Sequence, residues 1–173
     1  MKPVLILFAT AALYAQGLQP GAAVPDFNFT DFAGKPHTFH EYKGRVVLMD
    51  FWATWCKPCL AEMPHLKELY TKYHARGFEI IGLDAETLGQ RPADIDADLL
   101  RDQEARGHKI VGDLGAVWKH ANNTTAVPLA VNLFAAKTLP TKVLIDSNGK
   151  IAARIKKVEE LDALLPGLLN AAR

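Results

Sequence analysis

Residues 45–59 decide the fold of this chain, and they read Arg45-Val46-Val47-Leu48-Met49-Asp50-Phe51-Trp52-Ala53-Thr54-Trp55-Cys56-Lys57-Pro58-Cys59. The first part is mostly apolar and rich in β-forming residues, a pattern that predicts a buried central strand. A helix is predicted after the second cysteine, because apolar side chains recur there at helical spacing: Leu66, Leu69, Tyr70 and Tyr73. The two cysteines therefore lie where a strand turns into a helix.

The pair Cys56 and Cys59 is better explained by a chemical role than by stabilisation of the fold through a disulfide. These are the two cysteines of the chain, and a disulfide that closes so short a loop removes little entropy from the unfolded state. Redox chemistry and metal binding remain as interpretations. Free backbone N–H groups at a helix start favour a thiolate at Cys56. Pro58 suits the first turn because its missing N–H would have no partner there.

Composition describes an ordinary globular protein. The 173 residues are 49% hydrophobic and 23% charged, which suits one domain with a substantial core. Twenty basic and nineteen acidic side chains leave a formal charge of +1. Because nucleic-acid binding requires a clustered basic surplus, no nucleic-acid partner is expected.

The N-terminus has the pattern of a secretory signal. Lys2 precedes an apolar run from Val4 to Leu13, and the small residue Ala15 follows. The run is shorter than the roughly 20 residues that span a membrane. We expect residues 1–15 to be a signal peptide or an uncleaved N-terminal anchor, residues 16–23 a linker and residues 24–173 the domain. The alternative is an N-terminal core helix.

Residues 47–59 resemble the active-site segment of the thioredoxin superfamily, and in particular its exported branch of TlpA- and ResA-type proteins. The segment Val24 to Lys35 resembles the N-terminal hairpin of that branch, with Gly34 at the turn. Residues 139–146 resemble its cis-proline loop and following strand, and residues 147–150 form the next hairpin turn. Glu62-Met63-Pro64 resembles its glutamate and helix-kinking proline.

This resemblance implies an α/β protein with the thioredoxin-like fold. Its central mixed β-sheet is flanked by helices, preceded by an N-terminal β-hairpin extension, and interrupted by an insertion before the cis-Pro loop. The middle of the chain matches in outline only. There we expect a strand over residues 78–84, a helix from Ala93 to Arg106 that ends at Gly107, and a short strand over residues 109–111. Residues 118–128 are predicted to be an extra loop that borders the active site. A helix from Val158 to Ala172 closes the chain.

The resemblance also implies a role for each catalytic residue. Cys56 is the attacking thiolate, and Cys59 resolves the mixed disulfide. Asp50 matches the aspartate beneath the second cysteine, and Glu62 matches a glutamate one helical turn after it. An acid in an apolar strand should have a raised pKa, which suits Asp50 as a proton acceptor. The alternatives are a structural role for Asp50 and a solvated first-turn acid for Glu62.

A second loop is implied to complete the site. The peptide bond before Pro140 is cis in the family, and this loop faces the cysteines, with Leu139 pairing to the backbone of an extended client segment. The alternative is an ordinary proline at the start of a strand. Further client contacts are implied for Trp55, Lys57, Pro58 and Thr138. His37, His40 and His65 are predicted at the surface, so no metal site is expected.

The resulting expectation is an exported, periplasmic or otherwise extracytoplasmic, thiol–disulfide oxidoreductase that reduces disulfides. Its clients are exported proteins, for example in cytochrome c maturation or copper-site assembly, and an upstream membrane thiol reductant restores it. We expect a monomer without a cofactor or stable membrane insertion after signal cleavage. Two alternatives stay open: a disulfide oxidant or isomerase, and a copper-binding chaperone that uses Cys56, Cys59 and a histidine.

Overall fold

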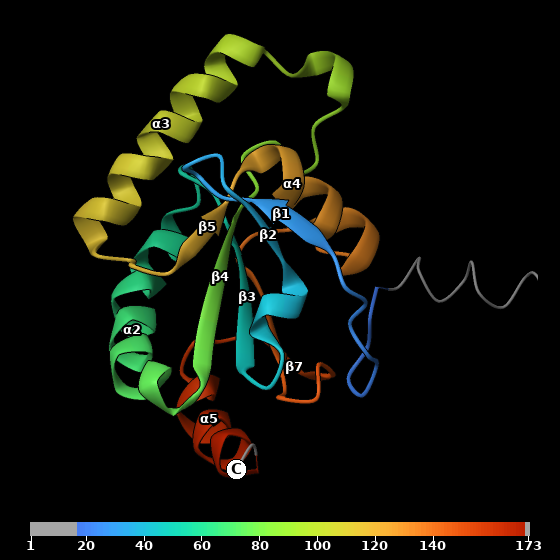
Figure 1. The fold of residues 1–173 in the computed structure, drawn as a ribbon. Helices are drawn as coiled ribbons and strands as arrows, with labels where there is room; N and C mark the ends of the chain where they lie inside the picture. The colour runs from blue at the N-terminus through green and yellow to red at the C-terminus, as the bar shows by residue number, and fades with distance from the viewer. Residues whose placement is uncertain (1–16, 172–173) are drawn as a thin grey trace, which may run out of the picture.

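A computed structural model describes residues 17–171, which are built around one five-stranded sheet of order β5-β4-β3-β6-β7 (Figure 1). Strands β3, β4 and β5 run parallel to one another, and β6 and β7 pair antiparallel. The predicted central mixed sheet is thereby confirmed. The strands are β3 (Val46–Trp52), β4 (Phe78–Asp84), β5 (Lys119–Ala121), β6 (Thr141–Ile145) and β7 (Ile151–Ile155).

The central strand β3 is buried along its whole length, as its apolar sequence predicts. Successive side chains point to opposite faces of a strand. Val46, Leu48 and Trp52 pack into the core on one face, whereas Val47, Met49 and Phe51 pack into the core on the other. The alternation places Asp50 on the same face as Leu48 and Trp52.

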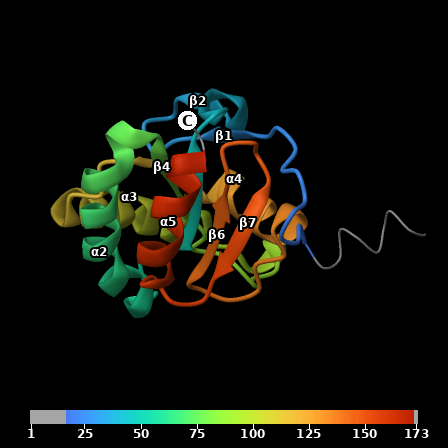
Figure 2. The same ribbon diagram turned by 90° about the horizontal axis from the view of Figure 1, so that it is seen from below.

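Helices cover both faces of the sheet. The long helices are α2 (Lys57–Tyr73), α3 (Ala97–Leu114) and α5 (Glu160–Ala171). All three contribute to the core beside Leu48 and Trp52. The opposite core is covered by α4 (Asn123–Pro128), the π-helical turn Leu129–Leu133 and the N-terminal hairpin. Figure 2 shows α2 and α5 on one side of the molecule and α4 on the other.

The predicted N-terminal hairpin is present, formed by β1 (Asn28–Thr30) and β2 (Pro36–Thr38). Gly34 adopts a positive φ of 79° at its turn, a conformation that glycine tolerates best. The prediction of a surface position for His37 is wrong. Its ring stacks on Phe29 and lies between two carboxylates, 2.9 Å from Asp31 Oδ2 and 3.2 Å from Glu41 Oε2.

The middle of the chain differs most from the prediction. Residues 109–111 are not a strand but part of α3, which continues through Gly107 and ends before Gly115. Gly107 lies where this helix approaches the sheet, since a Cβ there would lie 3.4 Å from the Trp52 ring. The predicted extra loop at residues 118–128 is instead β5 followed by α4, with Asn122 capping the helix. The irregular segment is the connection from β4 to α3.

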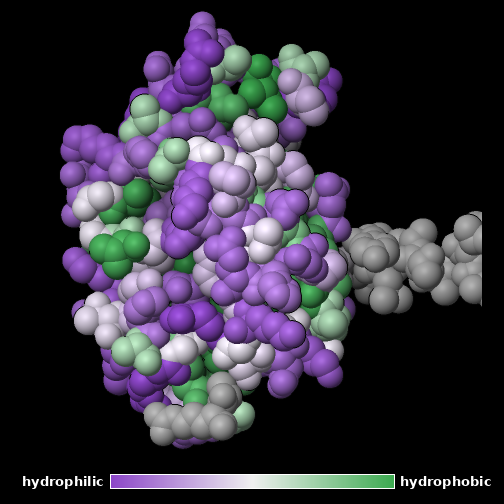
Figure 3. Space-filling model, in the orientation of Figure 1, coloured by the Kyte–Doolittle hydropathy of each residue, from purple (hydrophilic) through white to green (hydrophobic). Residues whose placement is uncertain are grey.

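The remaining features concern the ends and the surface. The predicted signal peptide lies outside the described residues, and within residues 17–171 no helix has the length and apolar character to cross a membrane. Residues 17–23 lie against the domain, with the Gly21 N–H donating to the Ile151 carbonyl at 2.8 Å. Figure 3 shows a mainly hydrophilic face with scattered apolar patches. Among residues 17–171, the large exposed hydrophobic side chains are Trp55, Leu99, Val117 and Val131.

Candidate active site

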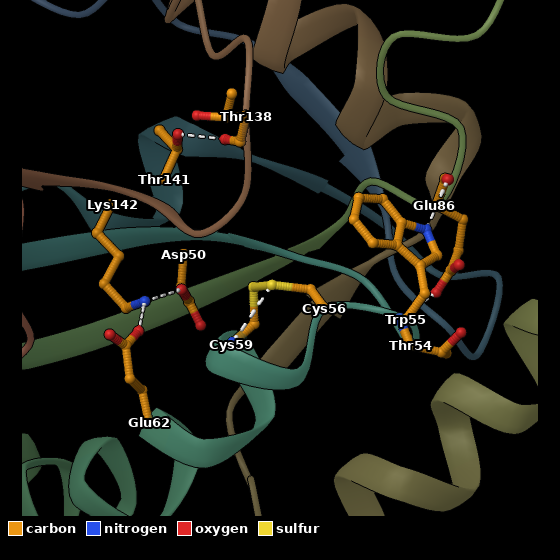
Figure 4. Close-up of a disulfide and its surroundings, with 10 residues drawn as sticks. All are labelled: Asp50, Thr54, Trp55, Cys56, Cys59, Glu62, Glu86, Thr138, Thr141 and Lys142. Carbon is orange, nitrogen blue, oxygen red and sulfur yellow. Dashed lines mark hydrogen bonds and ion pairs between the residues drawn. A yellow bond between two sulfur atoms is a disulfide. The ribbon is translucent and has the colours of Figure 1, made fainter.

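Cys56 and Cys59 form a disulfide at the junction of β3 and α2 (Figure 4). The predicted helix starts at Lys57, so Pro58 lies in its first turn, and the Cys59 N–H donates to Cys56 Sγ at 3.3 Å. An attacking thiolate at the helix start is expected to be exposed, whereas in this oxidised form Cys56 is 4% exposed and Cys59 is 1% exposed. The neighbouring Trp55 is 53% exposed and provides the accessible surface beside the sulfur atoms.

Asp50 lies behind the inner cysteine. Its side chain is almost completely buried on the α2 face of β3, and Figure 4 shows the carboxyl group pointing toward Cys59. Burial raises the pKa of this carboxyl, and the nearby Lys142 ammonium opposes that rise. The direction agrees with the prediction. A carboxyl with a raised pKa can hold a proton near neutral pH and release it to a suitably placed group.

Lys142 joins both predicted carboxylates. It is 4% exposed, and its Nζ lies 3.2 Å from Asp50 Oδ1 and donates a hydrogen bond to Glu62 Oε2. Although burial acts against the charged form, the two carboxylates raise the pKa of Lys142. Glu62 is therefore a partly buried, ion-paired side chain, and its placement differs from that of a solvated first-turn acid.

Lys142 is not among the site residues predicted from the sequence. The available signal is a lysine within an otherwise apolar strand, Thr141-Lys142-Val143-Leu144-Ile145. A buried lysine requires a partner because an unpaired charge is costly in the interior. The partner is set by the register of β6 on β3, which places Lys142 directly opposite Asp50.

The pairing of β6 on β3 also brings the predicted proline loop close to the cysteine turn. The Leu139–Pro140 peptide bond is cis, as the resemblance implies. Thr141, the next residue, pairs with Phe51 near the end of β3. Its Oγ1 donates to the Thr138 carbonyl at 2.7 Å, which closes the loop. The structure thus brings residues 138–140 to the end of β3 from which the cysteine turn begins.

The connection after β4 supports the cysteine turn, and this too was missed. The Ala85 N–H donates to the Trp52 carbonyl at 2.8 Å, and the buried Glu86 carboxylate accepts a hydrogen bond from the Thr54 N–H. The Trp55 indole N–H donates to the Glu86 carbonyl at 3.1 Å. Acidic residues directly after a buried parallel strand were the available signal, because neighbouring parallel strands end at the same edge.

Asp84 adds a second buried acid at this edge. It is fully buried, and neither carboxyl oxygen has a hydrogen-bond partner among residues 17–171. Burial, reinforced by the carboxylates of Glu86 and Glu104, raises the pKa of Asp84 from 3.8 to about 8. Asp84 is therefore mostly protonated at neutral pH, and this limits the negative charge that accumulates under the turn.

The remaining predicted features lie farther from the sulfur atoms. Residues 118–128 reach the site indirectly, because the Asn123 side chain accepts from the Thr87 N–H at 3.0 Å, one residue after Glu86. His40 is exposed, as predicted. His65 is half-buried, and its Nε2 lies 2.9 Å from Asp162 Oδ2 of α5. Within the described part of the chain, no three His, Cys, Asp or Glu side chains are grouped as metal ligands.

The fold and the dithiol turn define a thioredoxin-like thiol–disulfide oxidoreductase. Residues 20–154 match the family model described as the AhpC/TSA family. Thiol-disulfide oxidoreductase ResA of Bacillus thuringiensis (strain Al Hakam) is 35% identical over 138 residues, 80% of this chain and 70% of that protein. ResA of Geobacillus thermodenitrificans is 31% identical over 161 residues, 87% and 83% of the two chains. The chain belongs to the AhpC/TSA family and, within it, to the ResA-like thiol-disulfide oxidoreductases.

Solved structures agree with the fold. A thiol:disulfide interchange protein from Bacteroides sp. superposes with a TM-score of 0.69 at 23% identity, covering 88% of this chain and 91% of that one. A thioredoxin family protein from Chlorobium tepidum TLS gives a TM-score of 0.68 at 21% identity, covering 87% and 97%. At this level of identity the likeness concerns the fold alone.

Proposed function

We propose that this enzyme is an exported reductase of disulfides in other exported proteins, such as those of cytochrome c maturation or copper-site assembly. The observation that carries the proposal is the asymmetric setting of the dithiol. Both cysteines are buried in this oxidised form, but Cys56 lies at the helix start beside the exposed ring of Trp55, and Cys59 lies on the side of Asp50. One sulfur is placed to meet a client, and the other to exchange a proton.

The reaction transfers two electrons to the client. The Cys56 thiolate attacks one sulfur of the client disulfide, which forms a mixed disulfide and releases the other client sulfur as a thiolate. Cys59 then gives its proton to Asp50 and attacks Cys56 Sγ. The mixed disulfide breaks, the second client thiolate leaves, and the Cys56–Cys59 disulfide of this structure is formed. A membrane thiol reductant would restore the dithiol.

The client binds along an exposed rim around the sulfur atoms. Lys57, Pro58 and Thr138 are exposed, and Leu139 and Pro140 are partly exposed beside them. An extended client segment would pair with the backbone at Leu139, while Trp55 covers the side chains that flank the client cysteine. The Trp55 indole N–H donates a hydrogen bond to the Glu86 carbonyl. This bond fixes the ring and leaves its exposed side free to contact a client.

The proposal is tested by trapping clients with Cys59→Ser in the source cells. Without the resolving thiol, the mixed disulfide should persist on Cys56. The matched control is the double variant Cys56→Ser/Cys59→Ser, which should trap nothing. Recovery of exported proteins by the single variant alone supports the proposal, and recovery of no covalent partner contradicts it.

The direction of electron flow requires a second measurement, the reduction potential of the Cys56–Cys59 couple in glutathione buffers. A value below roughly −200 mV is expected for a reductant. A value well above it would overturn the proposal in favour of an oxidant or isomerase. Size-exclusion chromatography tests the expected monomer, and fractionation of cells tests export.

A further inference from the structure

Lys142 is the buried cation of the active site, and the mechanism proposed above does not use it. Its ammonium lies between two carboxyl groups from different elements, Asp50 of β3 and Glu62 of α2 (Figure 4). The side chain is 4% exposed, and Asp50 is even more deeply buried. Lys142 is thus separated from solvent and close to the acid that points toward Cys59.

The charges of this cluster do not balance if all three groups are ionised. One ammonium faces two carboxylates, which would leave one net negative charge at this buried position, and such a charge is costly in the interior. Glu62 accepts the hydrogen bond from Lys142 and is partly exposed, so water as well as the ammonium can solvate its carboxylate. Asp50 is 1% exposed, and burial raises the pKa of its carboxyl, so Asp50 is the carboxyl whose charged form depends most on the ammonium beside it.

We propose that Lys142 is a positioning residue of the redox reaction, which acts through Asp50 by stabilising its carboxylate whenever the Cys59 proton is transferred. This inference rests on the proposed role of Asp50 as the proton partner of Cys59. The ammonium is already 3.2 Å from Asp50 Oδ1, so no large movement is needed when the charge appears there. A hydrogen bond to Glu62 holds the ammonium in this place.

The proton balance shows where the lysine matters. During reduction of the disulfide, an incoming thiolate bonds to Cys56 Sγ, the S–S bond breaks, and Cys59 leaves as a thiolate. The Asp50 carboxyl then gives its proton to Cys59 and becomes a carboxylate. In the reverse direction Asp50 takes the proton back. Each direction passes through an Asp50 charge that the neighbouring ammonium stabilises.

The experiment follows reduction of the purified oxidised protein by dithiothreitol in stopped flow between pH 5 and pH 9, with tryptophan fluorescence as the signal. At each pH the rate is divided by the concentration of dithiothreitol thiolate, which removes the ionisation of the reductant and leaves the inflection of the protein. Lys142→Met should slow reduction by about tenfold or more near neutral pH. Its pH inflection should move to higher pH, because the Asp50 proton becomes harder to remove.

Two further variants separate this role from a structural one. Lys142→Arg keeps the cation and should recover most of the rate. Glu62→Gln removes the competing carboxylate, so the ammonium pairs with Asp50 alone and the inflection should move to lower pH. A loss of packing would not move the pH inflection of Lys142→Met and that of Glu62→Gln in opposite directions. Lys150→Met, at an exposed turn residue, is the matched control.

The outcomes are distinct. A folded Lys142→Met variant with the wild-type pH profile overturns the inference, as does a Glu62→Gln shift toward higher pH. If Lys142→Met does not fold, Glu62→Gln and Lys142→Arg still decide the matter. Because dithiothreitol replaces the client, a failure to trap clients would contradict the proposed function without affecting this result.

Discussion

Replacing Asp84 by asparagine should stabilise the oxidised protein, by an amount that grows as the pH rises. Asp84 ends β4 with both carboxyl oxygens buried and without hydrogen-bond partners among residues 17–171. Burial and the carboxylates of Glu86 and Glu104 raise its pKa from 3.8 to about 8. The folded state therefore keeps a proton that the unfolded chain releases above about pH 4.

The size of the effect follows from the two pKa values. Between them the wild-type free energy of unfolding should fall by about 1.4 kcal/mol for each pH unit, because the folded state binds the additional proton. By pH 7 the loss amounts to roughly 4 kcal/mol. The loss levels off above about pH 8, where Asp84 is ionised in both states. Asparagine does not titrate, so Asp84→Asn should match the wild type near pH 4 and exceed it progressively above that.

The assay is urea unfolding of both disulfide-intact proteins at pH 5, 7 and 8.5. Only the difference between variant and wild type is interpreted, which removes the titration of groups that do not interact with residue 84. Asp102→Asn, on the exposed face of α3, is the matched control and should give a difference that does not change with pH. A constant difference for Asp84→Asn, or a variant that becomes less stable with rising pH, would refute the reasoning.

Three further predictions concern contacts around the turn and the sheet. Glu86→Ala removes the acceptor of the Thr54 N–H, so we expect a stability loss of about 1–3 kcal/mol in urea unfolding and slower reduction by dithiothreitol; a change in neither would contradict the supporting role of Glu86. Gly82→Ala places a Cβ 2.2 Å from the His120 Nδ1 position, which should cost about 1–3 kcal/mol. Much of that loss should return in Gly82→Ala/His120→Ala, and simple additivity of the two changes would exclude a clash between them. Trp55→Phe loses the indole hydrogen bond but keeps a ring, so thermal unfolding should change little while reduction of a protein disulfide slows; equal rates would show that this hydrogen bond does not position a client contact.

Much of the fold could be predicted because its signals are local. The apolar run of β3, the helical spacing in α2 and the glycine at the hairpin turn each depend on a few neighbouring residues. The same is true of the placement of Cys56 and Cys59 at a strand–helix junction. Local patterns were sufficient for these elements because tertiary contacts do not override the local preference there.

The errors have a common physical origin in contacts between distant segments. The sequence predicts a helix end at Gly107, whereas this glycine is an interior residue of α3 packed close to the Trp52 ring. His37 was placed at the surface because its two carboxylate partners are recognised only when the hairpin has closed. Lys142 and Glu86 were missed for the same reason. Each is defined by a partner more than 30 residues away.

The asymmetry of the site depends on the alternation of β3. Asp50 and Trp52 point to the face covered by α2, and Lys142 points the same way because it pairs directly with Asp50. A shift of one residue in that strand would turn Asp50 to the opposite core. Cys59 would then lack an acid beside it, while the helix start that favours a thiolate at Cys56 would be unchanged. The strand register thus governs proton transfer at the inner cysteine, and the helix terminus governs attack at the outer one, so the two halves of the reaction can be altered separately.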